Sequence, residues 1–177
     1  IVFQRAFYQL LLGLALLFLP LRLLLRGLKE RGYWRHIPER FGFAAALPGQ
    51  PVWLHAVSVG EARAAAPLVE KLLAQTPAPP ILMTCMTPAG RATLESLFGT
   101  RATVRYLPYD LGWAMRRFLQ QTRPRFGIVM ETELWPNLVR EARCAGIELF
   151  LANARLSERS ARGYRKLEAL THATLGG

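Results

Sequence analysis

Short apolar runs alternate with longer amphipathic segments along most of the chain. Runs of strand length recur in five places: residues 52–57, 81–84, 103–107, 126–131 and 147–152. Segments with helical spacing separate and follow them: residues 62–75, 88–98, 111–121, 134–145 and 157–170. Strands that alternate with helices in this way indicate an α/β fold, because parallel strands need a crossover and the crossover helices cover the sheet. The pattern therefore predicts an α/β domain with a parallel sheet and helices on both faces.

The first helical segment of this domain contains one irregularity. Its apolar residues form a single stripe, and small alanines near its start allow close packing on the sheet. Pro67 interrupts the segment, because proline removes a backbone hydrogen bond from a helix interior. We therefore expect the helix either to begin after Glu61 or to kink at Pro67.

The first 47 residues follow a different pattern. Residues 6–21 carry no charge, and a basic stretch follows them at once. Arg22, Arg26 and Lys29 recur with helical spacing opposite a set of leucines, which is typical of a helix in the lipid headgroup layer. The apolar run is shorter than the roughly 20 residues that span a bilayer comfortably, so spanning is marginal. We predict an N-terminal hydrophobic helix, with residues 1–47 as a membrane-anchoring or interfacial segment and residues 51–177 as the α/β domain.

Two other interpretations compete for this N-terminal segment. A cleaved signal peptide would carry its positive charge before the apolar run, whereas here only Arg5 precedes it and arginines follow. A buried helix of the soluble domain is the second alternative, because the run has borderline length. The basic flank favours the membrane segment, and its place after the apolar run predicts that the rest of the chain is cytoplasmic.

Length and charge narrow the class of protein. The 177 residues suffice for one ordinary domain with a hydrophobic core and a short additional segment. With 23 Lys and Arg against 12 Asp and Glu, the formal charge is +11, which favours an anionic partner. Charge alone does not separate nucleic acid from an anionic lipid surface, but the apolar N-terminal run favours the membrane.

Polar side chains gather where the predicted strands end. In open α/β sheets, ligands bind at the carboxyl ends of the strands, where the strand order reverses. The residues at these ends include Ser58, Gly60, Glu61, Thr84, Thr87, Asp110, Glu131, Glu133, Asn153 and Arg155. Such an acidic and hydroxylated rim suits sugar hydroxyls better than a nucleotide pyrophosphate.

Common nucleotide and metal motifs are absent from the sequence. It contains no GxGxxG, GxxxxGK[ST] or HExxH pattern, so dinucleotide, P-loop and zincin sites lack their signatures. His36, His55 and His172 are scattered without the spacing of metal ligands. We therefore expect neither a metal site nor a bound cofactor.

Glu61 directly follows a glycine after the first strand of this domain. Gly60 would let the backbone turn sharply off the strand, and an acid beside a helix N-terminus lies in the positive field of that end. A carboxylate held in this way can act as a general base toward an attacking hydroxyl. Capping of the helix, or compensation of its dipole, is the structural alternative, and spacing alone favours that alternative.

Other polar residues of the rim have structural alternatives as well. Glu131 and Glu133 precede a helical segment that carries Pro136 in its first turn, so they can be ordinary strand-end acids. Two acids two residues apart can also share a site. The stretch of residues 153–157 could be only a loop that ends in a helix N-cap.

Five blocks of sequence together resemble one family. They are WLHAVSVGEARAAAPLV, TCMTPAGRATL, VRYLPYDL, VMETELWPNL and LANARLSERSARGYRKL. In this order and register they closely resemble the N-terminal half of the Kdo transferases, the 3-deoxy-D-manno-octulosonic acid transferases of lipopolysaccharide assembly. The resemblance covers nearly the whole chain, the hydrophobic leader included.

This resemblance implies a fold and an activity. Members of the family are membrane-associated, metal-independent, inverting glycosyltransferases of the GT-B type, with two Rossmann-like domains that face each other across a cleft. They transfer Kdo from the donor CMP-Kdo to a lipid A precursor, lipid IVA. The resemblance thus implies the cytoplasmic face of the cell inner membrane as location, these two substrates as partners and no cofactor. The aromatic residues are scattered and form no stacking surface in the sequence, so we expect no nucleic-acid partner.

The resemblance also implies roles for two acids. The acid of the SVGE block, Glu61, is the catalytic base, and the first acid of ETELWPN, Glu131, helps to stabilise the transition state. A bisphosphorylated lipid acceptor would also account for a basic and apolar leader, which holds the domain where that substrate lies.

In length, the sequence departs from the family. It ends shortly after the fifth helical segment, and the second domain, which binds CMP-Kdo in the family, is not part of it. We therefore expect residues 51–177 to supply the acceptor side and the base, and the chain by itself to transfer no sugar. The alternative from another class is a membrane-anchored α/β module that binds anionic lipid or nucleic acid without catalysis.

Overall fold

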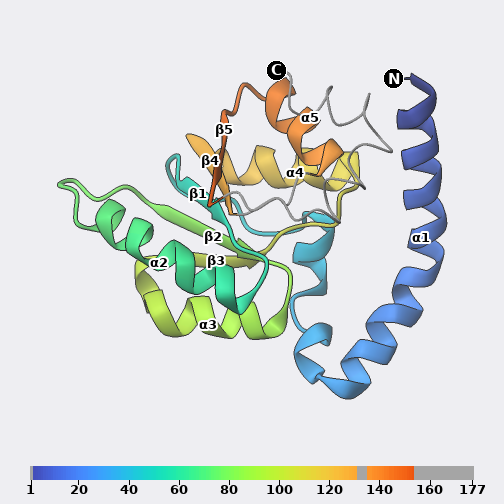
Figure 1. The fold of residues 1–177 in the computed structure, drawn as a ribbon, viewed down its shortest axis with the longest axis horizontal. Helices are drawn as coiled ribbons and strands as arrows, with labels where there is room; N and C mark the ends of the chain where they lie inside the picture. Colours follow the sequence, from blue (N-terminus) through green and yellow to red (C-terminus); the bar gives the residue numbers. More distant parts are fainter. Residues whose placement is uncertain (1, 131–134, 154–177) are drawn as a thin grey trace.

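The computed structural model of this protein describes residues 2–130 and 135–153 (Figure 1). Within these residues the centre of the molecule is a parallel sheet in the order β3-β2-β1-β4-β5. Val52 at the start of β1 lies opposite Ile81 of β2 and Phe126 of β4, so the three central strands begin at one level. The strands are β1 (Val52–His55), β2 (Ile81–Cys85), β3 (Thr103–Tyr106), β4 (Phe126–Met130) and β5 (Leu149–Ala152).

Helices connect successive strands and cover both faces of the sheet. Figure 1 shows α2 and α3 on one side of the sheet and α4 and α5 on the other. The bounds are α2 (Val59–Leu73), α3 (Pro88–Phe98), α4 (Gly112–Thr122) and α5 (Pro136–Cys144). The prediction of a parallel α/β sheet with helices on both faces is therefore confirmed. The helix predicted over residues 157–170 lies outside the described residues.

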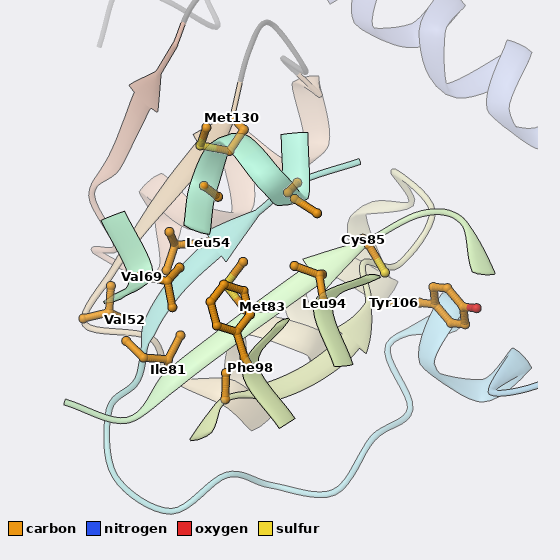
Figure 2. Close-up of a cluster of buried hydrophobic side chains, with 14 residues drawn as sticks. Val52, Leu54, Val69, Ile81, Met83, Cys85, Leu94, Phe98, Tyr106 and Met130 are labelled. Carbon is orange, nitrogen blue, oxygen red and sulfur yellow. The ribbon is translucent and has the colours of Figure 1, made fainter. Parts of the chain in front are cut away.

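Each face of the sheet has its own hydrophobic core, because successive residues of a strand point to opposite faces. Val52 and Leu54 of β1 pack with Val69 of α2 and Phe98 of α3, in the cluster that Figure 2 shows. On the other face, Trp53 is fully buried among side chains of β2, α4 and α5. Both faces of β1 are thus buried, which explains why this strand is an uninterrupted apolar run in the sequence.

The start of α2 differs from what the sequence predicted. The helix begins at Val59 rather than after Glu61, and it continues through Pro67 to Leu73. Gly60 therefore lies in the first turn of the helix, and its φ is not in the left-handed region. The expectation that Gly60 makes a sharp turn off the strand is wrong, because the chain leaves β1 through residues 56–58 and the helix has already begun.

The segment before the sheet consists of one long helix and two short 3-10 turns. Helix α1 (Val2–Lys29) is followed by η1 (Arg31–Trp34) and η2 (Ile37–Phe41). One further 3-10 turn, η3 (Gly99–Arg101), lies within the α/β domain after α3. The indole of Trp34 donates to the carbonyl of Leu23 at 3.2 Å, which folds η1 back against α1. No helix within the described residues combines the length and the apolar content that crossing a bilayer requires.

Candidate active site

The order of the strands places a switch point at the carboxyl ends of β1 and β4. From β1 the chain passes into α2 on one face, and the helix that follows β4, α5, packs on the other face. Ligands of open α/β sheets bind in the crevice that such a divergence leaves. Ser58, Gly60 and Glu61 follow β1 directly, so the structure places these predicted site residues at the switch point.

Ser58 and Glu61 form a capping box at the start of α2. The Ser58 hydroxyl donates to Glu61 Oε1 at 2.8 Å and accepts from the Glu61 backbone N–H at 3.3 Å. The second carboxylate oxygen, Oε2, accepts from the backbone N–H of Val57 at 2.8 Å. The contact with the Glu61 N–H satisfies one of the backbone donors that a helix start leaves without partners, and the contact with Val57 engages the N–H of the residue before the cap. The capping interpretation of Glu61 is thus confirmed, and its role as a base stays a prediction.

The capping contacts also fix the position of the Glu61 carboxylate. Glu61 is only 6% exposed, and both of its oxygens are held by atoms at the end of β1. Each oxygen of an ionised carboxylate can accept more than one hydrogen bond. The hydrogen bonds from Val57 and Ser58 therefore hold the carboxylate at the end of β1.

Gly60, the residue before Glu61, has open space where a side chain would lie. Its backbone is exposed, and a Cβ built at Gly60 would meet only the Ser58 hydroxyl, at 3.8 Å. The fold therefore does not require glycine here. Because glycine has no side chain, a ligand can approach the backbone closely at this position.

Thr84, by contrast, is fully buried beneath the site. Its hydroxyl accepts from the Trp53 indole at 2.8 Å and lies 2.9 Å from His55 Nδ1. All of these side chains come from the centre of the sheet, so this hydroxyl supports the strand ends and has no exposed surface for a substrate. Thr87 lies nearer the surface, where it caps α3 by accepting from the Gly90 N–H at 3.0 Å.

His55 at the end of β1 is neutral at physiological pH. Burial lowers the pKa of His55 to about 4, and the hydrogen bond with Thr84 only partly opposes this effect. Its Nε2 atom is buried and has no hydrogen-bond partner among the described residues. The ring lies edge-on to Trp135, with 6.1 Å between centroids, so it packs directly below the residue that precedes α5.

Asp110 caps α5 on the far side of the switch point. Its carboxylate accepts from the backbone N–H groups of Asn137 at 3.0 Å and Leu138 at 2.8 Å, and from the Tyr8 hydroxyl at 2.6 Å. Burial raises the pKa of Asp110, although the hydrogen bond from Tyr8 opposes this. Burial, and then the charge of Asp110, raises the pKa of Tyr8. Asp110 thus positions the start of the helix that follows residues 131–134.

Several predicted site residues lie outside the described part of the chain. They are Glu131, Glu133 and Arg155. Asn153, which follows β5, is described and has a left-handed backbone with φ of 54°. Asparagine tolerates this conformation better than most residues, so the loop role of Asn153 has a structural basis. Its predicted contact with substrate is not tested by this geometry.

Arg40 is a residue whose place the sequence did not reveal. It belongs to η2, yet it is only 1% exposed, and its guanidinium lies over the Tyr106 ring at 3.8 Å from the centroid. In the sequence it was one of many basic residues after the apolar run. Only its long-range packing on β3 distinguishes it, and no local pattern carries that information.

The described residues contain no group of three or more His, Cys, Asp and Glu side chains that could hold a metal ion.

The fold and the site together define a Rossmann-like α/β domain with a buried carboxylate at its switch point.

Comparison with known proteins identifies the family. The sequence model of the family described as 3-deoxy-D-manno-octulosonic-acid transferase (kdotransferase) matches residues 35–177. The chain is 42% identical over 171 residues to the 3-deoxy-D-manno-octulosonic acid transferase of Haemophilus influenzae, an alignment that covers 93% of this chain and 39% of that protein. It is 44% identical over 147 residues to the enzyme of the same name from Bordetella pertussis, covering 77% of this chain and 34% of that protein.

A plant protein extends the comparison. Over 138 residues the chain is 38% identical to the probable mitochondrial 3-deoxy-D-manno-octulosonic acid transferase of Arabidopsis thaliana, covering 77% of this chain and 30% of that protein. The chain thus spans between 30% and 39% of the length of these three relatives. It belongs to the Kdo transferase family, as the resemblance of its five sequence blocks implied.

Proposed function

We propose that this chain is the acceptor-side part of an inverting, metal-independent glycosyltransferase of the GT-B type, which transfers Kdo from CMP-Kdo to a lipid A precursor, lipid IVA, in lipopolysaccharide biosynthesis. The observation that carries the proposal is the position of Glu61. Within a chain of the Kdo transferase family, this carboxylate is held at the switch point of the sheet, where ligands of such folds bind.

In the proposed reaction, Glu61 accepts the proton of a primary hydroxyl on the acceptor sugar. The hydroxyl oxygen forms a bond with the anomeric carbon of Kdo, while the bond from that carbon to the phosphate oxygen breaks and CMP leaves with the electron pair. A single displacement of this kind inverts the anomeric centre. General bases typically contribute two to four orders of magnitude in rate.

Glu131 has the second role in this proposal. The transition state resembles an oxocarbenium ion, so its positive charge is stabilised by a carboxylate nearby. Asp110 supports this arrangement indirectly, since it caps α5, the helix that begins shortly after residues 131–134. Ser58, Gly60, Thr87, Glu133, Asn153 and Arg155 complete the proposed acceptor side.

We place donor binding outside the matched region. The relatives extend well beyond the part that aligns with this chain, since the aligned part is at most 39% of their length. In a GT-B enzyme the donor lies on the second domain, across the cleft from the base. The 177 residues would therefore bind the acceptor but hold no donor against it.

A membrane role for α1 is supported by its surface. Its apolar side chains are exposed along one side of the helix, with Leu17 at 74%, Phe18 at 67% and Leu28 at 67%. Leu19 and Leu23, on another side, are buried. A helix with one exposed apolar side and arginines nearby suits the interface of an anionic membrane. We propose the cytoplasmic face of the inner membrane as its location.

A chimera tests the proposed activity directly. Residues 1–177 of this chain replace the aligned region of the Haemophilus influenzae relative, and the product is assayed for transfer of Kdo from enzymatically generated CMP-Kdo to lipid IVA. We expect transfer by the chimera and none by the 177-residue chain alone. A folded chimera that binds lipid IVA yet transfers nothing, beside an active parent protein, would contradict the proposal.

A further inference from the structure

A polar contact joins the N-terminal helix α1 to the α/β domain. The hydroxyl of Tyr8 donates to Asp110 Oδ2 at 2.6 Å, across 102 positions of the sequence. Tyr8 is half-buried, and Asp110 is only 6% exposed. A hydrogen bond from a hydroxyl to a carboxylate is charge-assisted and stronger than one between neutral groups. The contact therefore stabilises one particular position of α1 on the domain.

The same carboxylate holds the start of α5. Asp110 Oδ2, the oxygen that accepts from Tyr8, also accepts from the backbone N–H of Asn137 at 3.0 Å, and Oδ1 accepts from the N–H of Leu138 at 2.8 Å. In return, the side-chain amide of Asn137 donates to the backbone carbonyl of Asp110. One oxygen atom thus receives a donor from α1 and a donor from α5.

Helix α5 depends on Asp110 for its cap. Its N-cap residue, Trp135, makes no capping hydrogen bond with its side chain, and Pro136 in the first turn has no N–H to donate. The first N–H groups that the helix presents are those of Asn137 and Leu138, and such groups need partners outside the helix. Asp110 supplies from another part of the chain the acceptors that the N-cap side chain does not provide.

Helix α1 reaches the same region at a second point. Leu23 is buried, and it lines a cavity together with Tyr109 and Trp135, which lie beside the capping carboxylate and the start of α5 in the sequence. Leu23 comes about four helical turns after Tyr8. Two contacts so far apart fix the direction of α1 as well as its position, so a change in how α1 sits on the domain reaches Asp110.

We propose that Tyr8 and Asp110 are positioning residues, through which the position of α1 on the domain sets the position of the start of α5. Neither residue touches substrate in this proposal. Helix α5 begins at Pro136, five positions after Glu131, so displacement of the helix start would displace the residues joined to it. The consequence for sugar transfer rests on the proposed function, whereas the link between α1 and α5 rests on the hydrogen bonds alone.

Amide hydrogen exchange tests this link without any substrate. The N–H groups of Asn137 and Leu138 donate to Asp110, so their exchange rates report the cap of α5 directly. By NMR on the 177-residue chain in neutral detergent micelles, Tyr8→Phe should raise both rates about tenfold or more, because the carboxylate loses a charge-assisted hydrogen bond. Exchange at Val129 in the central strand β4 should stay the same. Unchanged rates at Asn137 and Leu138 would overturn the proposal.

Tyr33→Phe is the matched control for the loss of a tyrosine hydroxyl. Tyr33 also belongs to the segment before the sheet, but its hydroxyl accepts from Arg26 at 3.3 Å. This variant should leave exchange at Asn137 and Leu138 as it is in the wild-type chain. Equal increases in the two tyrosine variants would mean that loss of either hydroxyl destabilises the chain in general, and would overturn the specific link through Asp110.

A double-mutant cycle shows whether Tyr8 acts through Asp110. Asp110→Asn should also raise the exchange rates at the start of α5, and Tyr8→Phe should add little in that background, because the acceptor of its hydrogen bond is already altered. Fully additive effects would overturn the proposal. If Asp110→Asn does not fold, the comparison of Tyr8→Phe with Tyr33→Phe still decides, since each of these changes removes only one hydroxyl.

Kinetics separate positioning from simple anchoring. In the chimera, Tyr8→Phe should lower kcat several-fold, while KM for lipid IVA and flotation with phosphatidylglycerol vesicles stay close to those of the parent. Loss of vesicle binding with unchanged kcat would show that Tyr8 only anchors α1 and would overturn its positioning role. Faster exchange in Tyr8→Phe beside an inactive parent chimera would refute the proposed function and leave the link between α1 and α5 standing. Unchanged exchange beside an active parent chimera would do the reverse.

Discussion

The hydroxyl of Ser58 and the carboxylate of Glu61 hold each other at the start of α2. Ser58 Oγ donates to Glu61 Oε1 at 2.8 Å and accepts the Glu61 backbone N–H at 3.3 Å. A side chain that caps a helix is usually structural, and a proposed base is functional. In the proposed mechanism one pair would serve both purposes, because the contacts that cap α2 also keep the carboxylate at the switch point of the sheet.

Ser58→Ala should lower both stability and turnover modestly. Loss of an N-cap hydroxyl costs about 1 kcal/mol of unfolding free energy, and the Glu61 carboxylate loses one of the contacts that orient it. Urea unfolding of the 177-residue chain measures the first effect, and the transfer rate of the chimera measures the second. Ser58→Thr retains the hydroxyl and should restore most of both. Equal defects in the two variants would contradict this account of the pair.

Gly60→Ala should separate folding from function. A Cβ at Gly60 meets only Ser58 Oγ, at 3.8 Å, and alanine is the better helix former, so the unfolding free energy should stay level or rise by up to about 1 kcal/mol. We propose that the acceptor passes over Gly60 on its way to Glu61, so the added methyl group should lower kcat/KM of the chimera for lipid IVA about tenfold or more.

Gly127→Ala is the matched control for this substitution. A Cβ at Gly127 would lie 2.6 Å from Trp53 Cε3 and 2.7 Å from Leu149 Cδ2, so it should cost roughly 1–3 kcal/mol of unfolding free energy. Full activity of the Gly60→Ala chimera would show that no substrate passes over this position.

The buried His55 predicts a specific loss of stability in acid. Its pKa is lowered from the ordinary value of 6.5 to about 4, so between these pH values the unfolded chain binds a proton that the folded chain excludes. The free energy of unfolding should therefore be unaffected by His55 above pH 6.5 and should fall by about 3 kcal/mol as the pH drops to 4. Urea unfolding at a series of pH values measures this.

Two histidine variants isolate that contribution from the carboxylates, which titrate in the same range. His55→Asn should remove most of the extra loss between pH 6.5 and 4. His36→Asn, which changes a half-exposed histidine of the segment before the sheet, should keep it. The same pH dependence in both variants would mean that His55 does not remain neutral in the folded protein.

Exposed leucines on α1 should hold the chain on a membrane. Leu17, Leu21 and Leu24 are all more than half exposed and recur at intervals that place them on one side of the helix. Replacing all three with Glu should lower partitioning into anionic vesicles at least about a hundredfold, because burial of several apolar side chains is lost. A vesicle flotation assay measures the bound fraction.

Salt distinguishes the apolar contact from a purely electrostatic one. The wild-type chain should stay bound in 1 M NaCl, since salt does not screen apolar burial. Leu97→Glu, on exposed surface of α3, should leave binding unchanged. Complete release of the wild-type chain by salt would mean that only the arginines touch the membrane.

Much of the sheet could be predicted because its strands are buried on both faces. The run that begins at Val52 is apolar throughout, and such runs between helical segments have few other interpretations. The ends were less predictable: β1 stops at His55 and α2 starts at Val59, because the Ser58 cap and not the apolar stripe sets the helix start.

Only part of the candidate site could be predicted from the sequence. The place of Glu61 beside a predicted helix start favoured capping or dipole compensation, and resemblance to a family added the role of a base. The burial of Thr84 depends on Trp53 and His55, which lie on the neighbouring strand. The buried position of Arg40 depends on its packing against Tyr106 of β3, which lies far along the chain. Local pattern carries no information on such contacts, because they arise only when the sheet assembles.

A Glu→Gln substitution at position 61 is well suited to test the proposed base. Glutamine at this position can also close a capping box, so the fold should lose little of its unfolding free energy. Glu70→Gln, on the same helix but exposed and paired with Arg101, is the matched control and should leave transfer unchanged.

The most direct measurement is the rate of Kdo transfer to lipid IVA by the Glu61→Gln chimera, compared with the unsubstituted chimera. We expect turnover to fall by at least about two orders of magnitude while thermal unfolding and acceptor affinity stay close to those of the parent. An unchanged rate in a folded Glu61→Gln chimera would show that Glu61 serves only to cap α2 and would contradict the proposed mechanism.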